Sequence, residues 1–140
     1  MPRKAAVALL RNDELPVRRE DDVVRVRQLV RSWAAELGFS LVDQTKLVTG
    51  ASELGRNTLE HGRGGHVRLE MLNDGSRRGL RMTFEDRGPG IPDLELALKD
   101  GYSTGSGLGL GLSGTRRLMS DFTIHSEVGK GTRVQVARWR

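Results

Sequence analysis

Two carboxylates and one amide are the side chains best placed for chemistry in this sequence. Glu53 and Asn57 are four residues apart, so on a helix they stand one turn apart on the same side. An amide oxygen suits Mg²⁺, which prefers a few protein oxygens together with phosphates and water. A neighbouring carboxylate can accept a hydroxyl proton or position a water molecule. The same spacing also occurs on ordinary solvated helix faces, so this pair alone is weak evidence.

The other carboxylate, Asp86, ends an apolar alternating stretch and is followed closely by Gly88 and Gly90. Glycines at such a place let a ring or another backbone approach closely. One interpretation is that Asp86 accepts a hydrogen bond from an exocyclic amine, such as that of adenine, while the glycines leave room for the ring. The other is that Asp86 begins a turn and accepts a hydrogen bond from its own backbone.

A second glycine-rich run precedes a helical pattern and is a candidate phosphate clamp. Successive backbone N–H groups and the start of a helix near Gly111 attract anions. A flexible linker is the alternative, but linkers do not alternate Gly with Leu. The spacing of the glycines could also suggest a dinucleotide-binding fold. We reject that interpretation, because only two strands and no helix follow, which is too few to build a βαβ series. The clamp residues are Gly105, Gly107, Leu108, Gly109, Leu110 and Gly111.

The apolar spacing predicts the elements that must position these groups. Helical periods run from a cap at Asp21 or Asp22 to Gly38, and from Ser40 to about His61. Two hairpins are expected, over 66–86 and from 122 to the end, with a short helix over 94–99 and another over about 110–119 between them. The predicted fold is an α+β two-layer sandwich, with a mixed, mostly antiparallel sheet and helices on one face.

The N-terminal part carries the weakest pattern. Residues 5–20 have room for one strand, best placed at 15–18, and residues 1–13 are interpreted as a flexible arm. A single domain over 1–140 is expected from the length of 140 residues and from the lack of any linker.

Composition narrows the class of protein. The chain has no cysteine, which excludes disulfides, thiolate zinc sites and cysteine nucleophiles. No apolar run approaches the roughly 18 residues of a membrane span, and a cytoplasmic protein without membrane contact is expected. The net charge is +5, but the basic residues are interspersed with acidic ones. Only six residues are aromatic (two Trp, one Tyr and three Phe). Few aromatic side chains argue against a base-stacking surface, so no nucleic-acid partner is expected.

Four motifs in order resemble those of the GHKL (Bergerat-fold) ATP-binding family. They are Glu53-Leu54-Gly55-Arg56-Asn57, Asp86-Arg87-Gly88-Pro89-Gly90, the run Gly105 to Gly111, and Gly129-Lys130-Gly131-Thr132. The short length and the runs 51–54, 86–92, 101–104 and 117–119 more narrowly resemble the anti-sigma-type serine kinases, especially the RsbT group of stressosome switch kinases. This narrower resemblance covers nearly the whole chain after about residue 14.

The resemblance implies a Mg²⁺- and ATP-dependent serine/threonine protein kinase acting on a STAS-domain protein. By position, Glu53 would be the general base, Asn57 a Mg²⁺ ligand and Asp86 the adenine contact. Gly88, Gly90 and Ile91 would line the adenine ring, and Thr132 would support the Asp86 contact. Residues 101–112 would close over the phosphates. Relatives of this kind also activate a PP2C-type phosphatase or hold a sigma factor.

One feature departs from some relatives, because residues 101–114 contain no Arg or Lys. Lys99, Arg116 or Arg117 would then have to reach the terminal phosphate, or Mg²⁺ and backbone N–H groups would have to suffice. An anti-sigma factor or nucleotide-gated binding module with little catalysis is the alternative function. A detached histidine-kinase domain is disfavoured, because no helical hairpin with a phospho-acceptor His precedes residue 21. The sequence leaves monomer and homodimer both open.

Overall fold

The computed structural model describes residues 7–99 and 111–140. The elements in chain order are β1 (Ala8–Val17), α1 (Glu20–Glu36), α2 (Leu41–Glu60), β2 (Gly65–Asn73), β3 (Arg78–Asp86), α3 (Leu94–Ala97), α4 (Gly111–Leu118), β4 (Asp121–Glu127) and β5 (Gly131–Trp139).

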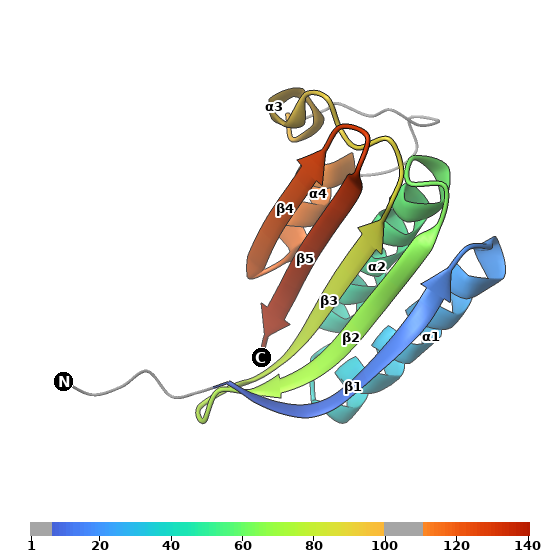
Figure 1. The fold of residues 1–140 in the computed structure, drawn as a ribbon. Coiled ribbons are helices and arrows are strands. Elements are labelled where there is room, and N and C mark those ends of the chain that lie inside the picture. The colour runs from blue at the N-terminus through green and yellow to red at the C-terminus, as the bar shows by residue number, and fades with distance from the viewer. Residues whose placement is uncertain (1–6, 100–110) are drawn as a thin grey trace.

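The strands form one five-stranded sheet in the order β1-β2-β3-β5-β4. Every neighbouring pair in it is antiparallel. Helices α1, α2 and α4 cover one face of the sheet, as Figure 1 shows. The predicted α+β two-layer sandwich is confirmed, and among the described strands no parallel pair occurs.

The core lies between the helices and the sheet because each element presents one apolar face. On β2 and β3 the inward positions alternate, so Val67, Leu69, Met82 and Phe84 are buried. On the helices the apolar residues recur at three- and four-residue steps, and Val26, Val30, Leu47, Ala51 and Leu54 belong to the same core cluster.

The caps of the two long helices differ in kind. Ser40 caps α2 as predicted, since its hydroxyl accepts the Asp43 N–H at 3.2 Å. The predicted cap of α1 at Asp21 or Asp22 is wrong, because the helix already begins at Glu20 after Arg19. The Asp22 carboxylate reaches back to accept the N–H groups of Arg18 and Arg19, and these bonds, the Arg18 bond above all, hold the pKa of Asp22 below its usual value.

The N-terminal strand is longer than predicted. It starts at Ala8 rather than near Leu15, and it pairs with β2 along its length, with a register shift between Leu9 and Arg11. A flexible arm over 1–13 is therefore wrong for residues 8–13. The strand was hidden from pattern reading because only its last residues reach the core, and Val17 alone is fully buried.

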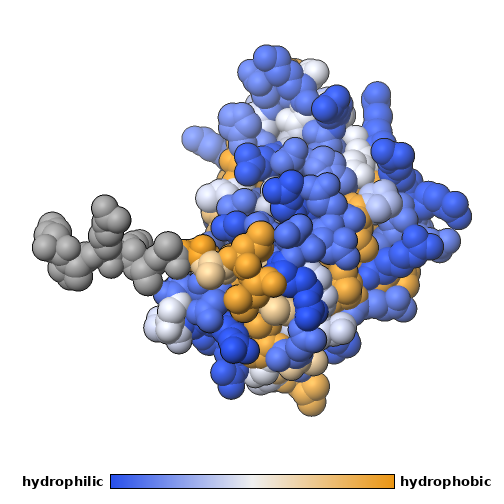
Figure 2. Space-filling view, turned by 60° about the horizontal axis from the view of Figure 1, so that its bottom comes forward, coloured by the Kyte–Doolittle hydropathy of each residue, from blue (hydrophilic) through white to orange (hydrophobic). Residues whose placement is uncertain are grey.

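Polar pairs hold the exposed part of β1 instead of apolar contacts. Arg68 donates to Glu14 across the β1–β2 ladder, and Arg11 pairs with Glu36 at 2.9 Å. Leu9 and Leu10 of β1 are nevertheless exposed. Figure 2 shows an apolar strip on an otherwise largely hydrophilic face of the molecule. None of the helices in the described residues is long and apolar enough to cross a membrane.

Candidate functional site

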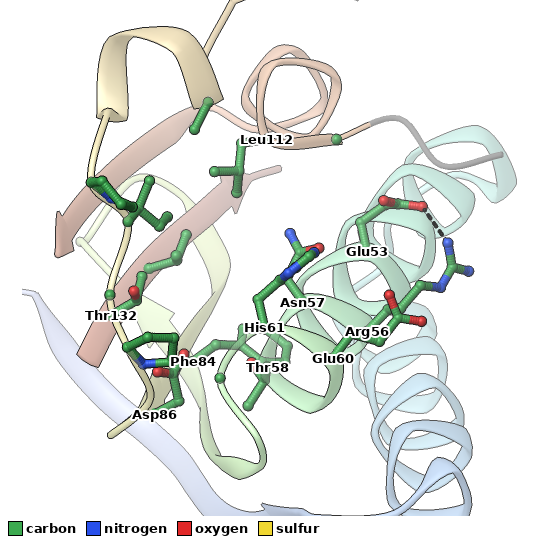
Figure 3. Close-up of a pocket in the computed structure, with 18 of the residues that line it drawn as sticks. Glu53, Arg56, Asn57, Thr58, Glu60, His61, Phe84, Asp86, Leu112 and Thr132 are labelled. Atoms are coloured by element: carbon green, nitrogen blue, oxygen red, sulfur yellow. Dashed lines mark hydrogen bonds and ion pairs between the residues drawn. The ribbon is translucent and has the colours of Figure 1, made fainter. Parts of the chain in front are cut away.

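A cavity of about 440 Å³ opens between the second half of α2, the end of β3 and the start of α4. Its wall brings together most of the residues that the sequence singled out, although they come from four separate parts of the chain. Those residues are Glu53, Asn57, Asp86, Gly90, Ile91, Gly111 and Thr132. Figure 3 shows Glu53 at one end of this cavity and Asp86 at the other.

Asp86 is held at the tip of β3 by a turn of its own making. Its Oδ1 accepts the N–H of Gly88 at 2.9 Å, and the residue is half-buried. The two interpretations of Asp86 are therefore compatible: one carboxylate oxygen fixes the turn while the side chain faces the cavity. Gly62 closes the site from the α2 side, because a Cβ built there would overlap the Asp86 carboxylate.

The loop after Asp86 is fixed from two directions. A Cβ on Gly88 would stand 2.8 Å from the Cα of Gly62, so this glycine is needed for the contact with the end of α2. Gly90 has φ +76° and lies against the backbone of Glu127, at the end of β4. The sequence predicts both glycines beside a bound ring, but only Gly90 lines the cavity. Gly88 instead packs on Gly62, because the turn at Asp86 points it toward α2.

Ser126 is a residue that sequence reasoning missed. Its hydroxyl accepts the N–H of Ile91 at 2.7 Å and shares a hydrogen bond with Thr132 at 2.8 Å. Thr132 lies opposite Asp86 in the β3–β5 ladder, as its predicted role requires, but the hydrogen bond of its hydroxyl is to Ser126. Thr132 is therefore linked through Ser126 to the loop that carries Ile91, and its support of the Asp86 contact stays a prediction. No local pattern could reveal the hydrogen bond between Ile91 and Ser126, because these residues are far apart in the sequence.

The opposite end of the cavity is formed by α2. Glu53 is buried with about 8% of its surface exposed, which sets it apart from an ordinary solvated helix acid. Its Oε1 accepts from the Nη1 of Arg56 at 3.3 Å, one turn further along the helix. Asn57 is half-buried on the same wall. The predicted pair thus faces a shared space, with Arg56 as an unpredicted neighbour.

An apolar surface connects the two ends. Its residues come from β3, β5, α3, α4 and the loop before α3, and Ile91 is the one among them that was predicted to lie beside the nucleotide base. Such a wall suits the faces of a flat heteroaromatic ring, with polar groups at its edges for orientation. The residues are Phe84, Ile91, Leu96, Ala97, Leu112 and Val134.

The predicted phosphate clamp is only partly visible. Gly105, Gly107, Leu108, Gly109 and Leu110 lie outside the described residues, whereas Gly111 begins α4 with φ +68° and lines the cavity. The cations proposed for the terminal phosphate, Lys99, Arg116 and Arg117, do not line it. Arg116 and Arg117 lie in the last turn of α4, at the opposite end from Gly111.

The charges around the cavity bear on what it can hold. Glu53, Glu60, Asp86 and Asp93 line it, and Arg56 is the one Lys or Arg among the described lining residues. Within the described part of the chain, no three His, Cys, Asp or Glu residues are grouped to hold a metal by themselves. A Mg²⁺ ion that takes most of its ligands from phosphates and water, with the Asn57 amide oxygen as a protein ligand, fits this donor set.

The comparisons with known proteins decide the family. Residues 42–140 match the model of the histidine kinase-, DNA gyrase B-, and HSP90-like ATPases. This chain belongs to that ATPase family. The match begins at the second residue of α2 and includes every described residue that lines the cavity. The resemblance to GHKL proteins is thereby confirmed, and membership of this ATPase family implies ATP as the nucleotide.

Two relatives in this ATPase family narrow the comparison. The chain is 45% identical over 130 residues to the serine/threonine-protein kinase RsbT of Bacillus subtilis, covering 91% of this chain and 98% of that protein. It is 30% identical over 120 residues to the anti-sigma F factor of Geobacillus kaustophilus, covering 80% of each.

A solved structure supports the fold alone. The structure of the RsbU and RsbW domains of a Mycobacterium tuberculosis protein matches with a TM-score of 0.63 at 23% identity. The match covers 93% of this chain, which spans about a third (33%) of that longer one.

Proposed function

We propose that this family member is an ATP-dependent serine/threonine protein kinase that phosphorylates a STAS-domain protein in a bacterial partner-switching pathway. The observation that carries the proposal is the position of Glu53. This acid is buried in the wall of the ATP cavity beside Asn57, where a solvated helix acid would not be. The 45% identity to a protein named as a serine/threonine kinase supports the same activity.

The nucleotide would lie along the cavity with its base near Asp86. The Gly88 N–H fixes one oxygen of this carboxylate, and the other would accept the exocyclic amine of adenine. The ring would lie on the apolar wall, against side chains such as Phe84 and Ile91. The phosphates would then extend toward Asn57 and the first turn of α4, whose N–H groups favour negative charge.

Glu53 would act as the general base at the phosphate end. The oxygen of a substrate serine or threonine bonds to the γ-phosphorus while the bond from that phosphorus to the bridging oxygen of ADP breaks. The hydroxyl proton passes to the Glu53 carboxylate, and ADP carries away the electron pair of the broken bond. When bound, Mg²⁺ would neutralise charge on the phosphate oxygens, with Asn57 as its protein ligand.

A second candidate function has an observation of its own. The 30% identity to an anti-sigma F factor favours a role in which the nucleotide-bound chain holds a partner such as a sigma factor. This role needs Asp86 and Asn57 but does not need a base. Activation of a PP2C-type phosphatase, a cytoplasmic location and the lack of a nucleic-acid partner stay predictions.

The test is transfer of labelled phosphate from γ-labelled ATP to STAS-domain proteins encoded near the gene of this chain. The kinase proposal expects acid-stable label on a serine or threonine of one of them. ATP-dependent complex formation without any label would favour the binding role. Acid-labile label on histidine would contradict both.

A further inference from the structure

Arg56 belongs to the wall of the cavity and, in the sequence, lies between the two α2 residues assigned to chemistry. It follows Glu53 by three residues and directly precedes Asn57. Its Nη1 lies 3.3 Å from the Oε1 of Glu53, and Figure 3 shows the two side chains joined at the end of the cavity away from Asp86. The Glu53 side chain is 10% exposed, whereas that of Arg56 is 46% exposed.

The contact between these side chains is loose for an ion pair. Charge-assisted hydrogen bonds between a guanidinium and a carboxylate usually measure about 2.7–2.9 Å. The Arg138–Asp43 pair in this structure has that geometry, with 2.7 Å between Nη2 and Oδ1. At 3.3 Å and half exposed, the Arg56 contact is one that a stronger anion can displace.

Among the described residues that line the cavity, only one Lys or Arg is present to bind such an anion. Four carboxylates face the space, and Arg56 is the sole Lys or Arg in its described wall. A terminal phosphate there needs a cation, and a guanidinium presents a planar fork of donors that matches phosphate oxygens. The cations first proposed from the sequence, Lys99, Arg116 and Arg117, do not reach the described wall.

We propose that Arg56 is the residue that senses the terminal phosphate of ATP. Without nucleotide, the Arg56 guanidinium pairs with the Glu53 carboxylate, so that this carboxylate is not available as the general base. When ATP binds, the guanidinium moves to the γ-phosphate, which leaves the Glu53 carboxylate able to accept the substrate proton. Arg56 thus distinguishes ATP from ADP and couples that distinction to the base. This inference rests on the proposed function, since it requires a γ-phosphate next to α2.

The test compares the affinities of ATP and ADP, measured by titration calorimetry with Mg²⁺. In Arg56→Ala, ATP affinity is expected to fall about tenfold or more, because a charge-assisted contact is lost. ADP affinity is expected to change less than about twofold, which also shows that the variant is folded. Arg56→Lys should restore part of the ATP affinity, since it keeps the charge but loses the fork.

Arg25→Ala is the matched control. Arg25 also stands three residues after a mostly buried acid, because it lies 3.9 Å from Asp22, whose side chain is 12% exposed. This pair lies on α1 and outside the cavity wall. Its removal should leave both nucleotide affinities unchanged. Equal weakening of ATP and ADP in Arg56→Ala, or no weakening of either, would overturn the inference.

The exchange of Arg56 between two anions has its own readout. Glu53→Gln removes the competing carboxylate, so ATP affinity should rise about two- to fivefold, and the rise should vanish when Arg56 is alanine. An equal rise with and without Arg56 would contradict the exchange. Absence of ATP binding to the unmodified chain would sink the proposed function itself. ATP binding with phosphate transfer but an unaltered ATP/ADP ratio in Arg56→Ala would sink only this inference.

Discussion

Gly62 and Asp86 are in contact at one end of the cavity, and this contact leaves no room for a side chain at residue 62. A Cβ built on Gly62 would overlap the carboxylate of Asp86. Gly88 also packs against Gly62, because a Cβ built on Gly88 would stand 2.8 Å from the Gly62 Cα. The turn that follows α2 therefore fixes the position of the carboxylate proposed to bind adenine.

Gly62→Ala is expected to displace Asp86 and to weaken ATP binding by about tenfold or more. Gly62 has no positive φ, so alanine meets no backbone strain there, and the effect comes from overlap alone. Overpacking of this kind costs about 1–3 kcal/mol of stability. The measurements are ATP affinity by calorimetry and the free energy of unfolding in urea.

Gly75→Ala is the control for a general loss of stability. Gly75 has φ +95° and lies in the turn between β2 and β3, outside the cavity wall. Alanine there costs about 1–2 kcal/mol of backbone strain, and ATP affinity should stay unchanged. If both variants weakened ATP binding equally, the specific link between Gly62 and Asp86 would be wrong.

Asp86→Asn tests the assignment of Asp86 to adenine. Asparagine retains an oxygen to accept the Gly88 N–H, so the turn should survive. It replaces the other acceptor with an NH₂ donor that would face the exocyclic amine. ATP affinity should fall about 10- to 100-fold, and the preference for ATP over GTP should shrink in competition binding. An unaltered preference would show that another group reads the base.

The hairpin turn at Asp74 gives a pH-dependent prediction away from the site. The Arg77 N–H, and then further bonds from Ser76 and the Arg77 side chain, lower the pKa of Asp74 from 3.8 to about 2. A carboxyl whose pKa is lower in the folded state stabilises the fold above its unfolded pKa, and this stabilisation is lost as the pH falls through the folded pKa. Asp74→Asn should therefore be less stable than the unmodified chain above pH 4.

The stability difference between Asp74→Asn and the unmodified chain should shrink between about pH 4 and pH 2. Urea unfolding at several pH values between 2 and 7 measures it. A difference that stays constant over this range would contradict the role of the ionised carboxylate. Because the side chain is near the surface, with 18% exposed, the effect should also be smaller in high salt.

Periodicity was sufficient to predict the parts of the fold with one buried face. The spans of α2, β2 and β3 follow from apolar spacing, and turn residues such as Asn73 and Gly75 mark the first hairpin. These elements place Glu53, Asn57 and Asp86, so both ends of the cavity were predictable. Local sequence determines them because each depends on which face of its own element is apolar.

The missed features depend on contacts between distant parts of the chain. Most of β1 is polar and exposed, and it is a strand because β2 supplies hydrogen-bond partners, which its own pattern does not show. Ser126 looks like one polar residue on a strand, yet its hydroxyl holds the backbone of Ile91. Arg56 looks like an ordinary helix cation until the burial of Glu53 shows that both face the cavity.

The most direct test of the central claim is phosphate transfer by Glu53→Gln to a STAS-domain substrate, measured at saturating ATP together with ATP binding. Loss of a general base predicts transfer slower by about 10²- to 10⁴-fold, while ATP binds at least as tightly as in the unmodified chain. Glu36→Gln, whose acid pairs with Arg11 outside the cavity, should transfer at the normal rate. Undiminished transfer by Glu53→Gln would contradict the account.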